Sequence, residues 1–238
     1  MPPQLTLHGK TITIALHATQ GRQGIKLWFE PGSSVLQVRA PGGRLGPEAE
    51  AFIRKKADWI LKTHSKISPQ VNQFRQFMER IDQGEVLYMG RWRDVALQPG
   101  AGRPKARFLE NGKLLLSGNT SLSAQNILAA TQALAKPYLH NRTLQWADYT
   151  GHRKDISRIS IRSQQSRWGS RSSSGSINLN WRLALMHPDM SDYVIIHELM
   201  HIREMNHSPA FWAHVESYCP DYKQLKKRVM DFGWSMAL

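Results

Sequence analysis

Residues 197–207 read HELMHIREMNH, so three histidines and a glutamate of this 238-residue chain fall within one short segment. On an α-helix, side chains four positions apart lie on the same face, which lets His197 and His201 direct their imidazoles at one point. Glu198 follows the first histidine directly, and from there its carboxylate can accept a proton from water without binding a metal itself. This spacing predicts a helix that supplies two metal ligands and a general base.

Such a site needs a third ligand, because a catalytic zinc is held by three protein side chains with one position left open. His207 lies six residues past His201, so the helix must end between them. Asn206 is expected in the left-handed conformation at that helix end, and Ser208 and Pro209 are expected to cap and begin the next helix. His207 is therefore the predicted third ligand.

The full pattern is H-E-x-x-H-x-x-E-x-x-H, which has the spacing of the metzincin motif. Glu204 stands where metzincins have glycine, the residue that permits their sharp turn. The number of histidine ligands therefore agrees with that class, whereas the turn residue does not. Two downstream carboxylates, Glu216 and Asp221, are alternative third ligands. We prefer His207 because its spacing matches a known motif, and three imidazoles favour zinc among the common divalent ions.

The motif helix is expected to begin at a cap formed by Ser191 or Asp192 and to run to about Met205. Its apolar residues recur at helical spacing on a face that leaves the histidines and the glutamate aside. These apolar residues are Ile195, Leu199 and Ile202.

Short runs of alternating apolar and polar residues predict β-strands over much of the first 120 residues. Asn111-Gly112 between two apolar runs predicts a hairpin. One helix is predicted over residues 46–66, and a further one is predicted with Ser68 as its cap and Pro69 at its first position. No internal repeat is evident in the sequence. The predicted strands comprise residues 5–9, 11–17, 25–30, 34–41 and 86–98.

The rest of the chain is predicted to be mainly helical, with two further strands. The helical pattern from Ser123 to about Tyr149 is expected to break or bend near Pro137. Residues 156–163 and 176–182 read as strands, and the Ser/Gly-rich segment RWGSRSSSG between them reads as a turn. The SINLN run in the second strand is either an edge strand that pairs with an extended substrate or the interior of a sheet.

The net charge of +14 and the pI of about 10.2 indicate either a polyanionic partner or a basic surface without a dedicated partner. The single cysteine, Cys219, excludes an internal disulfide and fits a reducing cytoplasm. The chain start lacks a signal-peptide pattern and no apolar run is long enough to span a bilayer, so we expect a cytoplasmic protein with no membrane association.

A local excess of basic residues covers residues 152–182. Arginine side chains there can bind phosphate or carboxylate groups through their fork geometry. The arginines are Arg158, Arg162, Arg167 and Arg171, of which Arg167 and Arg171 are the predicted substrate-binding residues.

Residues 167–229, RWGSRSSSGSINLNWRLALMHPDMSDYVIIHELMHIREMNHSPAFWAHVESYCPDYKQLKKRV, resemble the YgjP-like metallopeptidases, which are similar to the WLM and SprT-like zincins. A looser likeness extends to residues 35–61. The resemblance implies that Glu198 is the catalytic glutamate, and one departure is Arg171, which occupies the position of a cysteine in the family's RWGSCS segment. The implied zinc ligands are His197, His201 and His207.

These observations predict an α+β chain, with a β-rich part over residues 1–120 and a zincin-like catalytic part over residues 121–238, or one integrated domain. The predicted function is a zinc-dependent peptidase that acts on peptide or protein substrates with Glu198 as general base. One alternative is a metal-dependent nucleotide phosphohydrolase that uses the Arg158–Arg171 basic cluster. Another is a nucleic-acid-associated, SprT-like protease or binding module. The oligomeric state is left open.

Overall fold

The computed structural model describes residues 2–19, 24–30 and 33–233, and it confirms the predicted α+β class. Contacts between residues divide the chain into two compact units, of which unit 1 ends at Gln76 and unit 2 begins at Phe77. The division into a β-rich part and a catalytic part near residue 120 stays a prediction. Each unit is described by itself below.

Unit 1 contains a four-stranded sheet with the strand order β1-β2-β4-β3. The pairs β1–β2 and β3–β4 are antiparallel, whereas β2 and β4 are parallel. All four predicted strands of this region are confirmed. Their bounds are β1 Gln4–Leu7, β2 Lys10–Thr19, β3 Lys26–Phe29 and β4 Leu36–Pro41.

Two helices, α1 (Pro47–Lys55) and α2 (Ala57–Asp82), follow this sheet, and α2 continues into unit 2. The predicted single helix over residues 46–66 is therefore divided at Lys56. The prediction that Ser68 and Pro69 begin a new helix is wrong, because both lie inside α2. The Ser68 hydroxyl bonds the side chain of His64 one turn earlier instead of capping a helix. A proline inside a helix removes one backbone hydrogen bond, and α2 continues despite this loss.

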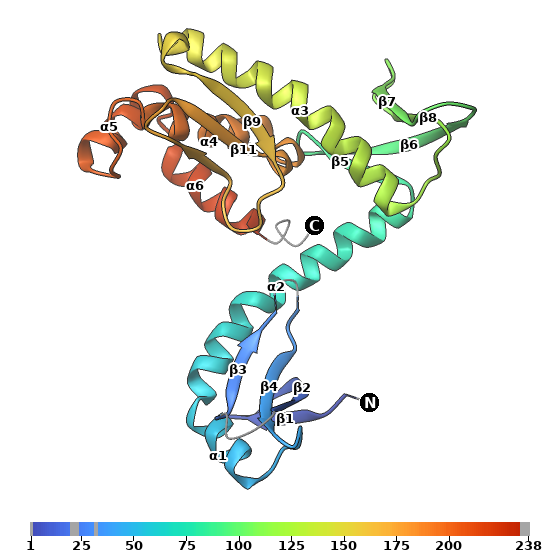
Figure 1. The fold of residues 1–238 in the computed structure, drawn as a ribbon, viewed down its shortest axis with the longest axis vertical. Helices are drawn as coiled ribbons and strands as arrows, with labels where there is room; N and C mark the ends of the chain where they lie inside the picture. The colour runs from blue at the N-terminus through green and yellow to red at the C-terminus, as the bar shows by residue number, and fades with distance from the viewer. Residues whose placement is uncertain (1, 20–23, 31–32, 234–238) are drawn as a thin grey trace. The chain divides into compact units, whose positions relative to one another are not determined.

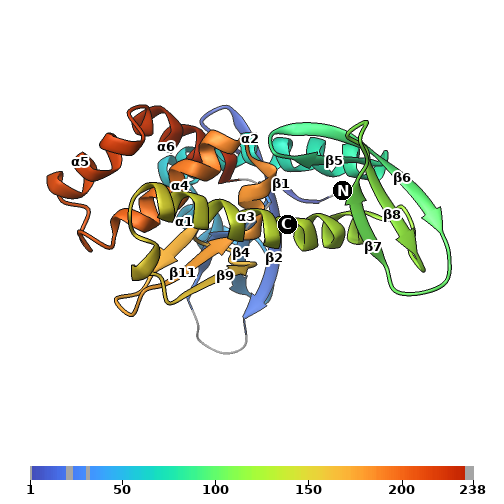
Figure 2. The ribbon, with the colours of Figure 1, turned by 90° about the horizontal axis from the view of Figure 1, so that it is seen from above.

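Unit 2 begins with a second four-stranded sheet, in the order β5-β6-β8-β7. Its pairs are again antiparallel, parallel and antiparallel, and the predicted Asn111-Gly112 hairpin joins β7 to β8. Figure 2 shows this sheet beside the beginning of α3 (Ala124–Tyr149). The bounds are β5 Glu85–Tyr88, β6 Arg91–Pro99, β7 Lys105–Phe108 and β8 Leu114–Gly118.

The two four-stranded sheets repeat one topology, a structural repeat that is not evident in the sequence. Even the first turns agree: His8-Gly9 and Met89-Gly90 both have positive φ at both positions. Two such residues match the type I′ hairpin turn, whose twist fits the flanking strands. The repeat is hidden in the sequence because strand pairing and turn geometry define it, and few side chains are shared.

The Met89-Gly90 turn also holds the segment that leads into the motif helix. Met89 N donates to Ala184 O at 2.7 Å, and Gly90 N donates to Leu185 O at 3.1 Å. A Cβ atom at Gly90 would lie 2.9 Å from His187 Cα, so this close approach requires glycine.

A three-stranded sheet in the order β10-β11-β9 lies beside the long helix α3 and the motif helix α4 (Pro188–Met200), as Figures 1 and 2 show. The strands β9 (Arg158–Arg162) and β11 (Ser176–Asn180) confirm the predicted ones. The segment predicted as a turn contains a further strand, β10 (Gly169–Arg171). SINLN is β11, the central strand, so it is sheet interior rather than an edge.

Short 3-10 helices, η1 (Arg153–Asp155) and η2 (Trp181–Leu185), flank this sheet, and α5 (Pro209–Tyr218) and α6 (Tyr222–Asp231) follow α4. Ser123 caps α3, which continues through Pro137 as one helix instead of breaking there. None of the helices in the described ranges combines the length and apolarity that crossing a membrane requires.

Candidate metal centre

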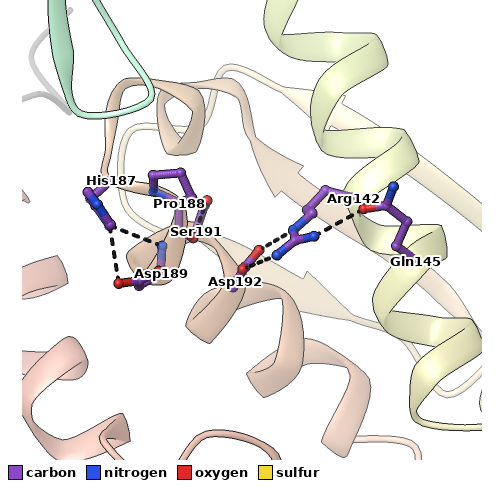
Figure 3. Close-up of polar contacts among 7 residues, drawn as sticks. All are labelled: Arg142, Gln145, His187, Pro188, Asp189, Ser191 and Asp192. Atoms are coloured by element: carbon purple, nitrogen blue, oxygen red, sulfur yellow. Dashed lines mark hydrogen bonds and ion pairs between the residues drawn. The ribbon is translucent and has the colours of Figure 1, made fainter.

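The motif helix α4 starts earlier than predicted. Pro188 occupies its first turn and the His187 ring accepts a hydrogen bond from Asp189 N, so the prediction that Ser191 or Asp192 caps the helix is wrong. The Ser191 hydroxyl instead donates to Pro188 O at 2.8 Å. Figure 3 shows these contacts at the start of the helix. Proline is well suited to a first turn because its missing N–H has no intrahelical partner there.

An ion pair fixes α4 against α3. Arg142 Nε donates to Asp192 Oδ1 at 2.7 Å, and a terminal guanidinium nitrogen donates to Asp192 Oδ2 at 2.5 Å (Figure 3). Asp192 is only 8% exposed, and this bidentate geometry is the strongest form of arginine–carboxylate contact. The helix that carries the motif is therefore held in both position and rotation.

The helix ends at Met200, five residues before the predicted end. Asn206 does not adopt the left-handed conformation expected of it; in the described ranges the non-glycine residues with positive φ are His8 and Met89. Hydrogen-bonded turns at residues 201–203 reverse the chain instead, and Asn206 N donates to the Glu204 carboxylate at 3.3 Å. The prediction that Ser208 caps the next helix is confirmed, since its hydroxyl accepts from Phe211 N.

This reversal brings the three motif histidines together. One possible ligand atom from each of His197, His201 and His207 lies within 4.8 Å of the other two, and the Nε2 atoms of His197 and His207 are 3.0 Å apart. His201 is buried, His197 is half-buried and His207 is exposed. The cluster is therefore open to solvent on the side of His207.

The rings are oriented by contacts outside the cluster. His201 Nδ1 lies 3.0 Å from Glu204 O, so a proton on Nδ1 leaves Nε2 free to bind a metal. His197 Nδ1 is buried and has no hydrogen-bond partner among the described residues. Its ring is held by packing against Phe211, at 4.9 Å between ring centroids, and Phe211 also stacks on His201 at 4.5 Å.

Burial favours the neutral form of the His197 and His201 imidazoles. It lowers the pKa of His197 to about 3, helped by His201, His207 and Lys226. Burial also lowers the pKa of His201. Neutral imidazoles keep the lone pair that a metal ligand needs.

The three residues fit a zinc ion. Nitrogens about 2.0–2.1 Å from a tetrahedral zinc lie roughly 3.3 Å from one another, which is close to the separation observed for His197 and His207. Three imidazoles also leave the fourth position free, as a catalytic site requires. The other candidates for third ligand, Glu216 and Asp221, are not part of any metal-binding group found among the described residues.

Glu198 lies beside the histidines and is 5% exposed. Burial raises the pKa of its carboxyl group to about 7, while the positive charge of Arg167 opposes this shift. Gly169 in β10 is packed directly on this side chain, because a Cβ atom at Gly169 would lie 2.5 Å from Glu198 Oε1. The contact of Gly169 has no signal in the sequence other than a glycine within the segment predicted to be a turn.

A cavity of about 240 Å³ adjoins Glu198 and His197. Its lining is mostly apolar and includes one lysine. The other lining residues are Trp168, Gly169, Tyr193, Val194, Lys226, Val229 and Met230. Tyr193 thus lines the same cavity as Glu198, whereas Tyr218 lines a different cavity with Asp189 and Asp192.

The arginines of the predicted basic cluster do not lie together, because the strands that carry three of them are at opposite edges of the three-stranded sheet. Arg158 and Arg162 lie on β9, at the opposite edge from Arg171 on β10. Arg171 donates to His201 O at 3.1 Å, so it holds the end of α4, and Arg167 is exposed. Substrate binding by Arg167 and Arg171 stays a prediction.

The fold and the histidine cluster define a protein with a candidate metal site on a helix beside a small sheet. The YgjP-like metallopeptidase domain family matches residues 23–231, and the chain belongs to this family of metal-dependent peptidases. Among solved structures, the chain is similar to the metallopeptidase zymogen of Pyrococcus abyssi abylysin. The two share 24% sequence identity at a TM-score of 0.36, over 39% of this chain and 92% of that one. No curated protein matches the chain.

Proposed function

We propose that the chain is a zinc-dependent peptidase in which His197, His201 and His207 bind the metal and Glu198 is the general base. The observation that carries this proposal is the convergence of three imidazoles within 4.8 Å beside a buried carboxylate. A bound zinc ion supplies Lewis acidity, which polarises a carbonyl group and lowers the pKa of water.

The residues of the chain supply the proton transfer. The Glu198 carboxylate is adjacent to His197 and faces the cavity, so it accepts a proton from the attacking water and passes it to the leaving amine. Packing against Gly169 limits the positions of this side chain. The mostly apolar lining of the cavity suits an apolar substrate side chain and helps to exclude water.

Strand β10 supports an extended substrate. It is an edge strand, it contains Gly169, which contacts Glu198, and it pairs only with β11 among the described strands. An extended peptide can add to such an edge through backbone hydrogen bonds. The division of the arginines between two sheet edges favours this peptide substrate over the nucleotide that a single basic cluster would bind.

Metal content and hydrolysis test the proposal together. We expect about one zinc per purified chain, lost in His201→Ala and retained in His140→Ala, which removes an exposed histidine of α3. Glu198→Gln should keep the zinc and lose hydrolysis of unfolded casein by at least a hundredfold, the scale of general-base catalysis. Full activity of the zinc-loaded Glu198→Gln variant would contradict the assigned role.

A further inference from the structure

The sheet of unit 1 has two faces of different character. Side chains on one face form the core of this unit together with residues of α1 and α2, such as Ile53 and Ile60. Because side chains alternate along strands, the intervening residues point to the other face. The helices in the described part of unit 1 pack on the first face and not on the second. Figure 1 shows α1 and the start of α2 on the same side of the strands. The core residues of the strands are Leu5, Leu7, Ile12, Ile14, Leu36, Val38 and Ala40.

The second face carries aromatic and basic side chains that contact one another, which we call the Trp28 patch. Lys26 Nζ lies 5.8 Å and Arg39 Cζ 5.4 Å from the centre of the Trp28 ring. The His17 ring lies 5.3 Å from that ring at an angle of 31°, and its Nε2 lies 2.6 Å from Gln37 Oε1. The cations flank the indole near the outer limit of a cation–π contact, about 6 Å.

Strand register explains why these residues meet. Trp28 is opposite Gln37, Lys26 is opposite Arg39, and Arg39 is opposite His17 in the parallel pair. Gln37 is buried beneath the patch and is bonded to His17, so it fixes one ring beside the other. Lys26 and His17 are exposed, and Trp28 and Arg39 are half-buried.

The second copy of this topology shows that the fold does not need the patch. At the corresponding register positions of unit 2, Arg107 replaces Trp28, Gln98 replaces His17 and Ser117 replaces Arg39. The same topology therefore forms without aromatic side chains at these three positions. The aromatic pair is a feature of unit 1 alone, and folding of the repeated topology does not account for it.

The charged residues within the strands of this sheet are all basic. Residues 1–76 contain eleven Lys and Arg against four Asp and Glu. The strands β1 to β4 contain Lys10, Lys26 and Arg39 and no acidic residue. This surface is therefore complementary to a polyanion.

We propose that the Trp28 patch binds single-stranded nucleic acid. A base stacks on the indole of Trp28 while Lys26 and Arg39 contact the adjoining phosphates, the combination that single-strand binding proteins use without sequence preference. An acidic peptide would be attracted by the same charge, but its carboxylates would not stack on two adjacent aromatic rings on an open sheet face, as nucleic-acid bases do. This binding is separate from the histidine cluster and does not depend on peptidase activity.

Fluorescence anisotropy of the full chain with labelled 20-nucleotide oligo(U) and oligo(dT), in the presence of a chelator, tests the role of the ring. Trp28→Ala should weaken binding at least fivefold, since one stacked base contributes about that much at the low end. Trp28→Phe keeps an aromatic face and should bind within about threefold of wild type. The matched control is Tyr149→Ala, which removes an exposed aromatic ring from α3 in unit 2 and should change nothing.

A charge-matched pair of double variants tests the phosphate contacts. In the Lys26→Glu, Arg39→Glu double variant, the negative slope of log affinity against log salt should become shallower by about 1.4. Each lost phosphate contact to a single strand removes about 0.7 from the size of this slope. Lys55→Glu with Lys62→Glu changes the net charge equally from exposed sites on α1 and α2 and should have a smaller effect.

Three results would overturn the proposal. The first is no binding to either oligonucleotide at low salt. The second is equal losses in the two double variants, which would indicate only a general positive surface. The third is an oligonucleotide affinity that does not change in Trp28→Ala, together with displacement of the oligonucleotide by poly-glutamate at equal charge concentration. This result would indicate an acidic protein partner.

Discussion

Gly169→Ala is the sharpest test of how the sheet positions the carboxylate of Glu198, the proposed general base. The added methyl carbon would lie 2.5 Å from Glu198 Oε1, 2.7 Å from Cγ and 2.8 Å from Cδ. Ordinary contacts between such atoms are about 3.5–4.0 Å, so the carboxyl group must move by about 1 Å. The three nearest atoms all belong to Glu198, so the displacement falls on this side chain and not on the histidines.

The expected result is a loss of activity without a loss of folding or metal. A displacement of about 1 Å in a catalytic group reduces the rate roughly a hundredfold. Stability should change by no more than about 1 kcal/mol, because the strain of an altered Glu198 rotamer and the reduced entropy of the unfolded alanine chain act in opposite directions. Casein hydrolysis, zinc per chain by elemental analysis and a urea titration measure the three quantities.

Gly100→Ala is the matched control, because its Cβ would meet no atom within 4 Å and its backbone does not require glycine. It should leave all three quantities unchanged. Wild-type activity in zinc-loaded Gly169→Ala would refute the reasoning, since it would mean that the Glu198 carboxylate need not occupy the position defined by β10. Loss of zinc from this variant would likewise contradict it, because the crowding would then act on the ligands.

Arg142→Ala should lower the free energy of unfolding by about 2 kcal/mol in a urea titration, since it leaves the buried Asp192 carboxylate without its partner; an unchanged midpoint would mean that the pair contributes nothing. Burial raises the pKa of the Cys219 thiol to about 11, so roughly one molecule in a thousand carries a thiolate at pH 8. Its reaction with a disulfide reagent should therefore be at least a hundredfold slower in the native chain than in urea. Zinc at a hundred times its dissociation constant for the wild-type chain should stabilise that chain by about 2.7 kcal/mol, measured by thermal unfolding. A shift of the same size in His207→Ala at the same zinc concentration would exclude that residue as a ligand.

Local patterns in the sequence were enough for many individual elements. Alternation predicted the four strands of unit 1, and the Asn111-Gly112 pair predicted the β7–β8 hairpin. The Ser208 cap followed by Pro209 was also correct. These features depend on side chains within a few residues of one another, so the pattern contains the physical information.

Predictions failed where a segment is compatible with more than one local structure. Ser68 and Pro69 have the sequence of a helix start, yet they lie within α2. Asp192 can act as a cap, but Arg142, fifty residues earlier in the chain, engages its carboxylate. The repeat of the two four-stranded sheets was invisible in the sequence, since pairing order and turn conformation leave little trace in side-chain identity.

By itself the sequence predicted the type of chemistry that we propose for the site. Helical spacing makes neighbours of His197 and His201 and places Glu198 beside them, whatever the rest of the fold. Tertiary structure alone decided what surrounds them. It buries Glu198 under Gly169 of an edge strand, joins Arg171 to the end of α4 and turns the chain so that His207 meets His197. These contacts join residues on different elements, and packing fixes them, whereas helical periodicity acts only over a turn or two.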